Sequence, residues 1–276
     1  MTHGLTLDFD SVYQHLDSII KGHTIDLSDI EFIHPWSIVM ICLLLIERHA
    51  YTDRELILPR NPATRGYLKR MHFHKILREI GYVSQAEQLE QLAVPEKENL
   101  NIQEIVHCLY RDEFNVRLER FIQMFQNFGL SLQDSFLATG VVGELGNNVF
   151  DHNSFSWPTN ISGSIIMAQN YPKLRCIEVA IGDPGIGFRG SLAAAFPKLK
   201  SDVEAIRTGL AGNSGRVGET RGNGLRLIQQ WTIQNFSGAL MVQSGDGLVI
   251  VRKGQIEDRT VQRIVGTLTQ FVIHYS

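Results

Sequence analysis

Cysteine and long apolar runs are scarce in this chain of 276 residues. Its three cysteines are odd in number, widely separated and set among apolar residues, which indicates free thiols in a reducing compartment rather than a disulfide framework. No cysteine–histidine cluster has the spacing of a zinc site. The longest apolar run, residues 38–46, is shorter than the ~20 residues that span a bilayer, and residues 1–10 lack the basic start and apolar core of a signal peptide. We therefore expect a cytoplasmic protein with no membrane partner.

A strong charge of either sign is also missing. The net charge is −3, so there is no electrostatic reason to expect nucleic acid or an anionic membrane as a partner. No G-x-x-x-x-G-K-[ST] loop is present, which excludes a P-loop nucleotide site. The length suggests two domains, each able to bury a core. A polar, charged stretch at residues 94–101 is the expected boundary, which gives domains over residues 1–95 and 100–276.

The first domain alternates short strands and helices. Strands are predicted over residues 24–27 and 55–58. One helix is predicted from Pro35, in its first turn, to residue 49, and another over residues 66–80. This alternation predicts a small α/β layer structure.

The second domain is organised around a helix predicted to follow Ser131, a good N-cap residue. Glu144, Asn148 and His152 recur every fourth residue on it, so they share one stripe. A neighbouring apolar stripe would pack on a sheet, and it consists of Leu137, Val141, Leu145 and Val149. The polar stripe should then lie at the edge of the buried face, where a ligand fits between helix and sheet.

Glycine is frequent in two parts of this domain. Within the predicted helix, positions 140, 143 and 146 are glycines, and each costs roughly 1 kcal/mol in a helix interior, so something should approach the backbone closely. Residues 188–221 form a long glycine-rich connection, which is more often functional than accidental. The other predicted elements are a strand over 101–108, a helix over 112–128, a hairpin of strands 239–244 and 248–253, and a final strand over 267–275.

Two short glycine motifs flank the long connection. A strand predicted over residues 176–181 runs directly into Asp183, Gly185 and Gly187. Gly222 and Gly224 open the helix that follows the connection. A polar helix stripe, an aspartate with two glycines after a strand, and a second glycine pair at a helix start therefore stand in order along the chain.

The first glycine motif also allows a different interpretation. Gly185, Gly187 and Gly190 match G-x-G-x-x-G after a strand, the fingerprint of Rossmann dinucleotide-binding folds. That interpretation leaves the helix of Glu144, the carboxylate of Asp183 and the second glycine pair without a role.

Residues 26–37, DLSDIEFIHPWS, resemble the signature loop of STAS domains, the fold of anti-sigma-factor antagonists, and residues 67–77 fit the last helix region of that family. Where phosphorylated members have Asp-Ser-Ser-Gly, this chain has His34, Pro35, Trp36 and Ser37. Trp36 stands at the phosphoacceptor position and has no hydroxyl, which leaves Ser37 as a substitute acceptor. The resemblance therefore implies a docking or dimerisation role for this domain rather than a phosphorylation switch.

The ordered motifs of residues 100–276 resemble the N box and the two glycine boxes of the GHKL superfamily, which includes DNA gyrase B, histidine kinases and MutL-type mismatch-repair proteins. The implied fold is α/β: a small STAS-like domain followed by a Bergerat-type α/β sandwich, a mixed sheet with helices on one face. The implied ligands are ATP and Mg²⁺.

Each motif residue then has a physical role. Asp183 would accept a hydrogen bond from the amino group of adenine, where guanine presents an acceptor instead. Gly185 and Gly187 would let the backbone pass close to the base and ribose. Gly222 and Gly224 would present helix N–H groups to phosphate oxygens.

The polar stripe would serve the phosphate end of the nucleotide. Asn148 offers a carbonyl oxygen to Mg²⁺, which keeps several waters and bridges to phosphates. Glu144, one turn earlier, would act as general base for a water or hydroxyl that attacks the γ-phosphate. His152 occupies a position where the family often has a basic or polar residue near the phosphates.

What the ATP is used for stays open at this level. The resemblance favours a regulatory protein that works as a nucleotide-driven conformational or partner switch with slow hydrolysis. The alternatives are a serine/threonine protein kinase like the anti-sigma-factor kinases, and a nucleotide sensor without turnover. A regulatory protein partner is expected in each case, and the resemblance also admits a homodimer.

Overall fold

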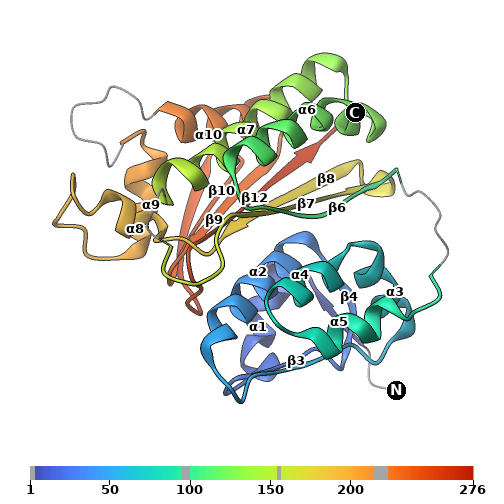
Figure 1. The fold of residues 1–276 in the computed structure, drawn as a ribbon. Helices are drawn as coiled ribbons and strands as arrows, with labels where there is room; N and C mark the ends of the chain where they lie inside the picture. The colour runs from blue at the N-terminus through green and yellow to red at the C-terminus, as the bar shows by residue number, and fades with distance from the viewer. Residues whose placement is uncertain (1–3, 95–99, 154–156, 214–222, 276) are drawn as a thin grey trace.

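The computed structural model describes residues 4–94, 100–153, 157–213 and 223–275. Within these ranges the protein is built on one seven-stranded sheet, with helices of the second half of the chain on one face and residues 4–94 on the other (Figure 1). We call residues 4–94 the N-terminal unit. No helix in the described ranges combines the length and the apolar character that crossing a lipid bilayer requires. Of the predicted domain boundary at residues 94–101, residues 95–99 lie outside the described ranges.

The N-terminal unit is a small α/β layer, as predicted. Its strands are β1 Leu5–Leu7, β2 Ile20–Lys21, β3 Thr24–Asp26, β4 Ile30–Ile33 and β5 Glu55–Ile57. Its helices are α1 Phe9–Ile19, α2 Pro35–Glu47, α3 Pro62–Arg70, α4 Phe73–Glu79 and α5 Val83–Glu90, with a short 3-10 turn at Arg48–Ala50. β1 pairs with β4 in parallel, and β2, β3 and β5 form a separate three-stranded sheet. The two predicted strands and the helix start at Pro35 are confirmed.

The single helix predicted over residues 66–80 is wrong, because the chain breaks between α3 and α4. His72 lies in the left-handed region with a φ of 60°, which a continuous α-helix does not allow. The break leaves the carbonyl oxygen of Met71 accessible to a distant strand, and the N–H of Ile105 donates to it at 2.9 Å. This bond ties the N-terminal unit to the edge of the large sheet.

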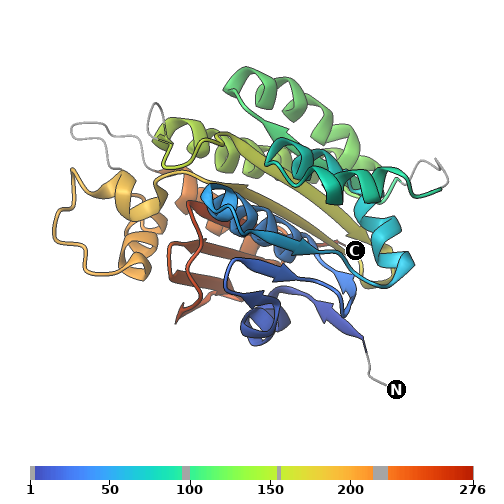
Figure 2. The ribbon, with the colours of Figure 1, turned by 60° about the horizontal axis from the view of Figure 1, so that its bottom comes forward.

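Helix α2 is the apolar centre of the molecule. Every residue from Pro35 to Ile46 is buried, which is the pattern of a helix that is covered on all sides. It packs against central strands of the large sheet (Figure 2). Trp36 and Ser37 are fully buried, and the Ser37 hydroxyl donates to the carbonyl oxygen of Asp8 at 3.2 Å. Ser37, the substitute phosphoacceptor, is therefore enclosed within the protein. Helix α2 packs against the large sheet of its own chain.

The large sheet has the strand order β11-β10-β9-β12-β8-β7-β6. Its strands are β6 Ile102–Cys108, β7 Ser164–Tyr171, β8 Cys176–Asp183, β9 Ala239–Ser244, β10 Gly247–Arg252, β11 Gln255–Thr260 and β12 Thr267–His274. Every described pairing in it is antiparallel, so the predicted mixed sheet is wrong. The dinucleotide interpretation is wrong as well, because it needs parallel neighbours beside the strand that precedes Gly185. The predictions at 101–108, 176–181, 239–244, 248–253 and 267–275 correspond to strands, whereas β7 and β11 were not predicted.

The helices of the second half are α6 Arg111–Asn127, α7 Leu132–Asn153, α8 Gly187–Leu192, α9 Asp202–Leu210 and α10 Asn223–Gln234. α6, α7 and α10 cover one face of the sheet (Figure 1). The Ser131 hydroxyl accepts the N–H of Asp134 at 3.1 Å, which confirms the predicted N-cap of α7. The long connection predicted over residues 188–221 is wrong in its first part, because α8 and α9 occupy it and α9 packs on β10.

The glycines of α7 serve helix packing. A Cβ atom built on Gly146 would lie 2.1 Å from the ring of Phe114, and one on Gly143 would lie 3.0 Å from Leu118. Both neighbours belong to α6, so the close approach predicted from these glycines is that of a helix rather than a ligand. Gly140 faces Trp231 of α10 at an ordinary 3.7 Å.

Alternate residues along a strand of the sheet contribute to two apolar cores, one on each face of the sheet. Val179 and Ile181 of β8 belong to the core under α6, α7 and α10, whereas Ala180 between them belongs to the core that contains α2. The core that contains α2 continues without interruption into the N-terminal unit. The two halves of the chain therefore share one hydrophobic core across the sheet.

Candidate functional site

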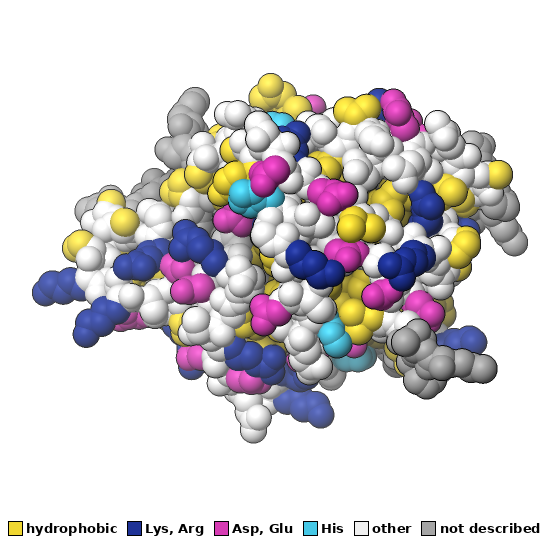
Figure 3. All heavy atoms as spheres, turned by 90° about the horizontal axis from the view of Figure 1, so that it is seen from below, with side chains coloured by type: hydrophobic (Ala, Val, Ile, Leu, Met, Phe, Trp, Pro, Cys, Tyr) yellow, Lys and Arg dark blue, Asp and Glu magenta, His cyan; other side chains and the backbone are white. Residues whose placement is uncertain are grey.

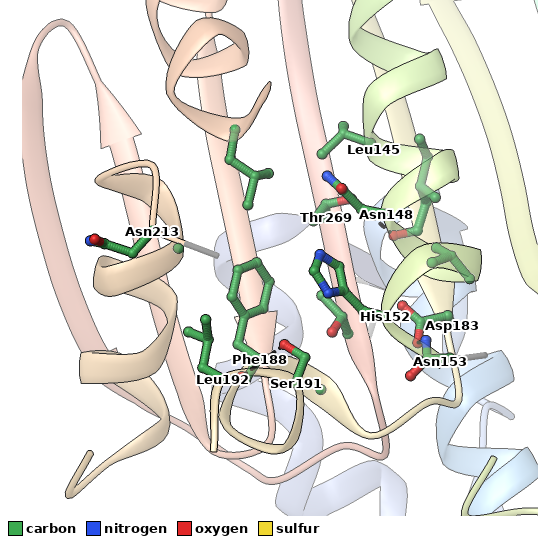
Figure 4. A pocket seen from close by; sticks show the side chains of 16 residues that line it. Leu145, Asn148, His152, Asn153, Asp183, Phe188, Ser191, Leu192, Asn213 and Thr269 are labelled. Carbon is green, nitrogen blue, oxygen red and sulfur yellow. Dashed lines mark hydrogen bonds between the residues drawn. The ribbon is translucent and has the colours of Figure 1, made fainter. Parts of the chain in front are cut away.

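A cavity lies between the C-terminal half of α7, the end of β8 and helix α8 (Figure 4). About 630 Å³ of non-atom space lies within it and at its mouth, open solvent included. The described residues lining it are Leu145, Asn148, Val149, His152, Asn153, Ile181, Asp183, Gly187, Phe188, Ser191, Leu192, Gly209, Asn213, Leu225, Thr267 and Thr269. Its walls are mostly apolar, so the few polar groups would orient a ligand.

Asp183 ends β8 and is 4% exposed. Its Oδ1 accepts two hydrogen bonds, from the side-chain amide of Asn153 at 2.8 Å and from the backbone N–H of Gly185 at 2.9 Å. Burial raises the pKa of Asp183 to about 7, and the two bonds act in the opposite direction. A ligand that donates a hydrogen bond to this carboxylate would favour its ionised form.

The glycines after Asp183 make room for the protein's own side chains. A Cβ atom on Gly185 would lie 2.1 Å from Oδ1 of Asn153. Gly187 has a φ of +68°, and a Cβ atom there would lie 2.5 Å from the hydroxyl of Ser244. That hydroxyl accepts the N–H of Phe188 at 2.9 Å, which fixes the start of α8. The requirement for glycine at both positions therefore arises within the fold.

Asn148 and His152 both line the cavity, as the polar stripe predicts. The amide nitrogen of Asn148 is buried and has no hydrogen-bond partner among the described residues. A buried, unpaired amide is uncommon in folded proteins, and it is a candidate for a ligand contact. His152 points from α7 into the cavity, toward Phe188 (Figure 4).

Glu144 stands one turn beyond the lining, where α7 meets the start of α10. A Cβ atom built on Gly224 would lie 1.7 Å from its Oε1, so the carboxylate rests directly on that glycine. Burial raises the pKa of Glu144, and the nearby charge of Asp151 adds to the rise. Gly222, the other predicted phosphate-binding glycine, lies outside the described residues.

Two residues that the sequence did not single out complete the site. Asn153 is 3% exposed and bonds both to Asp183 and, through its Oδ1, to the N–H of Ile186 at 2.8 Å. Thr269 of β12 lines the cavity and donates to the carbonyl oxygen of Ile181 at 3.2 Å. A signal for Asn153 was present, because it continues the four-residue spacing of the apolar stripe after Val149. A polar residue on a buried stripe needs partners.

The structure thus brings together Asn148, His152, Asp183 and Gly187 in one cavity and places Glu144 against Gly224 beside it. Among the described residues, no group of three or more His, Cys, Asp or Glu side chains is arranged to hold a metal ion. A scan against protein-family models finds no match to this chain, and a search of curated proteins finds none either. The case for a function therefore rests on the geometry of the site.

Proposed function

We propose that this protein binds ATP with Mg²⁺ in the cavity between α7 and the sheet, and that it is a regulatory protein of the GHKL type. Nucleotide binding and slow hydrolysis would switch its conformation or its protein partner. The observation that carries the proposal is Asp183, a carboxylate 4% exposed at the end of a strand in a largely apolar cavity. The two described protein donors both bind its Oδ1, so its Oδ2 can accept from a ligand, and the amino group of adenine is such a donor.

The far end of the cavity supports a phosphate site. Asn148 offers a side-chain amide there with an unpaired nitrogen. No Lys or Arg is among the described residues that line the cavity, so His152 is the cationic candidate at its wall. A Mg²⁺ ion would take one oxygen from Asn148 and the rest of its ligands from phosphates and water, which is the usual pattern for this ion. Bound there, the ion would neutralise phosphate charge.

In this proposal Glu144 acts as the general base. It is half-buried, and its pKa is raised, so it holds a proton more readily than an exposed glutamate. Its contact with Gly224 places the carboxylate at the start of α10, where helix N–H groups favour anions. A single base without a cationic clamp among the described lining residues agrees with slow turnover.

Calorimetric titration of purified protein with ATP and Mg²⁺ tests the binding site. Asp183→Asn removes the charge while keeping an oxygen for the bonds from Asn153 and Gly185. Since a hydrogen bond to a charged group is worth about 1.5–3 kcal/mol, we expect ATP affinity to fall at least about tenfold. Asp17→Asn, a change of the same kind at an exposed carboxylate, is the matched control. Wild-type protein without ATP affinity, or Asp183→Asn with unchanged affinity, would refute the proposal.

Turnover measurements then separate the uses of ATP. We expect slow phosphate release by the wild type, lost in Glu144→Ala and in the isosteric Glu144→Gln, with ATP still bound. Transfer of labelled phosphate to a partner protein would instead identify a serine/threonine kinase. Tight binding with neither release nor transfer would identify a nucleotide sensor.

A further inference from the structure

We propose that Asn153 is the positioning residue that makes the cavity selective for a 6-aminopurine over a 6-oxopurine. This inference rests on the proposed ATP site and deepens it. Asn153 does not need to touch the base. It acts through Asp183, by fixing which oxygen of the carboxylate faces the ligand and by holding that carboxylate as a hydrogen-bond acceptor.

The geometry of the amide carries the inference. Its nitrogen donates to Oδ1 of Asp183 at 2.8 Å, and its oxygen accepts the N–H of Ile186 at 2.8 Å. The N–H of Gly185 donates to the same Oδ1 at 2.9 Å. Both bonds end on Oδ1, so Oδ2 is the oxygen without a bond among the described residues. Asn153 and the turn after β8 therefore form a clamp that leaves one acceptor for a ligand.

The clamp is rigid because it is enclosed. Asn153 is 3% and Asp183 is 4% exposed. The position of a Cβ atom on Gly185 coincides with the Asn153 amide, at 2.1 Å from its oxygen, so the amide has its place only because residue 185 is glycine. Such an arrangement positions one side chain through another and is fixed before a ligand arrives.

The chemistry of the base converts this geometry into selectivity. Adenine carries an amino donor at its position 6, whereas hypoxanthine carries a carbonyl acceptor there. An ionised carboxylate accepts from the first and repels the second, while a protonated carboxyl group can donate to the second. Because the Asn153 amide donates to Asp183, it favours the ionised form against the opposing effect of burial. Loss of the donor would shift the cavity toward 6-oxopurines at neutral pH.

Of the described residues that line the cavity, His152 is the other one with an ionisable side chain beside Asp183. β12 contributes Thr267 and Thr269 beside it, and α2 contributes the apolar Val39 and Leu43 behind Gly182. ATP and ITP have the same triphosphate. Any effect of His152 on the binding of the phosphates, and the titration of the phosphates themselves, therefore cancel in the ratio of ATP to ITP affinity.

The test measures that ratio from pH 6 to pH 9 for the full chain, with Mg²⁺ present. In the wild type we expect the ratio of ATP to ITP affinity to rise with pH as Asp183 ionises. In Asn153→Ala the rise should move to higher pH, and at pH 7 the ratio should fall by at least about threefold. Asn153→Asp keeps the acceptor for the N–H of Ile186 but replaces the donor to Asp183 by a carboxyl group. The rise in the affinity ratio should then move to a still higher pH than in Asn153→Ala. Asp17→Asn, a change at an exposed carboxylate outside the described cavity lining, is the control and should leave the ratio unchanged.

A structural role alone would weaken both nucleotides equally and leave the ratio where it is, which would overturn the inference. Because Asn153→Ala could fail to fold, the carboxyl carbon of Asp183 is also titrated by NMR in wild type and Asn153→Asp without nucleotide. An unchanged titration midpoint overturns the clamp whatever the nucleotides do. A shifted midpoint in a protein that binds no ATP refutes the proposed function but supports the clamp.

Discussion

The two faces of the seven-stranded sheet are covered in different ways. On one face α2 presents apolar side chains all round, and its core runs from the sheet into the N-terminal unit. On the other face α7 presents an apolar stripe beside a polar one, and the cavity lies along the polar stripe. The same strand, β8, serves both, because alternate side chains point to opposite faces.

The difference shows how one strand joins stability to a binding site. Gly182 has no side chain, and its Cβ position lies 2.5 Å from Cγ1 of Val39, so α2 approaches β8 directly behind the site. The next residue, Asp183, carries the buried carboxylate on the opposite face. Polar contacts with the N-terminal unit on this side include the bond from the Tyr13 hydroxyl to Gln243 at 2.7 Å and the contact of His34 Nδ1 with Glu178 of β8 at 3.1 Å. Acidic and basic side chains are intermixed over the face of the molecule shown in Figure 3.

The largest expected effect comes from the charge on the cavity face. Burial raises the pKa of Asp183 from 3.8 to about 7, so the folded protein prefers the protonated form. Stability contributed by this group is full below about pH 4 and is lost progressively as the pH rises to about 7. Asp183→Asn has no such loss and should be more stable than the wild type at pH 8 by up to about 4 kcal/mol, at 1.36 kcal/mol per pKa unit. Denaturant unfolding at pH 5 and pH 8 measures this; equal stability at pH 8 would contradict it.

The next effect probes the contact between the faces. Gly182→Ala places a methyl group against Val39, which is fully buried, and should destabilise the fold by about 2–3 kcal/mol. Val39→Ala removes the opposing atoms, so the double variant should be less destabilised than the sum of the two single variants by at least about 1 kcal/mol. Urea unfolding of the four proteins completes the cycle. Additive effects would mean that α2 does not press on β8 at this point.

The glycines of α7 separate packing from helix propensity on the cavity face. Gly146→Ala should cost about 2 kcal/mol, because the Phe114 ring against it is fully buried and cannot move away. Gly140→Ala meets Trp231 only at an ordinary 3.7 Å and should gain up to about 1 kcal/mol of helix propensity. Thermal unfolding of the two variants compares them. Effects of the same sign would show that α6 packs on α7 differently.

The smallest effect is expected at the rim of the N-terminal unit. Asp10 and Arg259 pair at 3.5 Å, with side chains 58% and 36% exposed. Exposed pairs contribute little, so Asp10→Ala should change the free energy of unfolding by less than about 1 kcal/mol. A larger loss in the same unfolding assay would mean that charge, rather than the apolar core, seats the N-terminal unit on the sheet.

Local signals predicted the elements that carry the site. Ser131 predicted the start of α7, the spacing of Asn148 and His152 predicted two of its cavity residues, and the strand before Asp183 predicted the end of β8. Each of these signals lies within a few residues of what it determines, since caps, helix periodicity and strand ends are local features.

Features that depend on distant partners were missed or misread. The break at His72 serves a bond from Ile105, which is more than thirty positions away. β11 is polar and exposed, and its place is set by pairing with β10 rather than by an apolar pattern. The glycines of α7 predicted a close approach to the backbone but not its source, and α6 packs against Gly143 and Gly146.

The sequence by itself determined which helix carries the polar stripe and which strand ends in the aspartate. It also determined where α2 begins, because Pro35 fits the first turn of a helix. Only the tertiary structure decided that α2 is buried against the back of the same strand, and that Asn153 meets Asp183. The physical reason is that periodicity assigns a side chain to a face, whereas a contact between faces depends on how separate elements pack together.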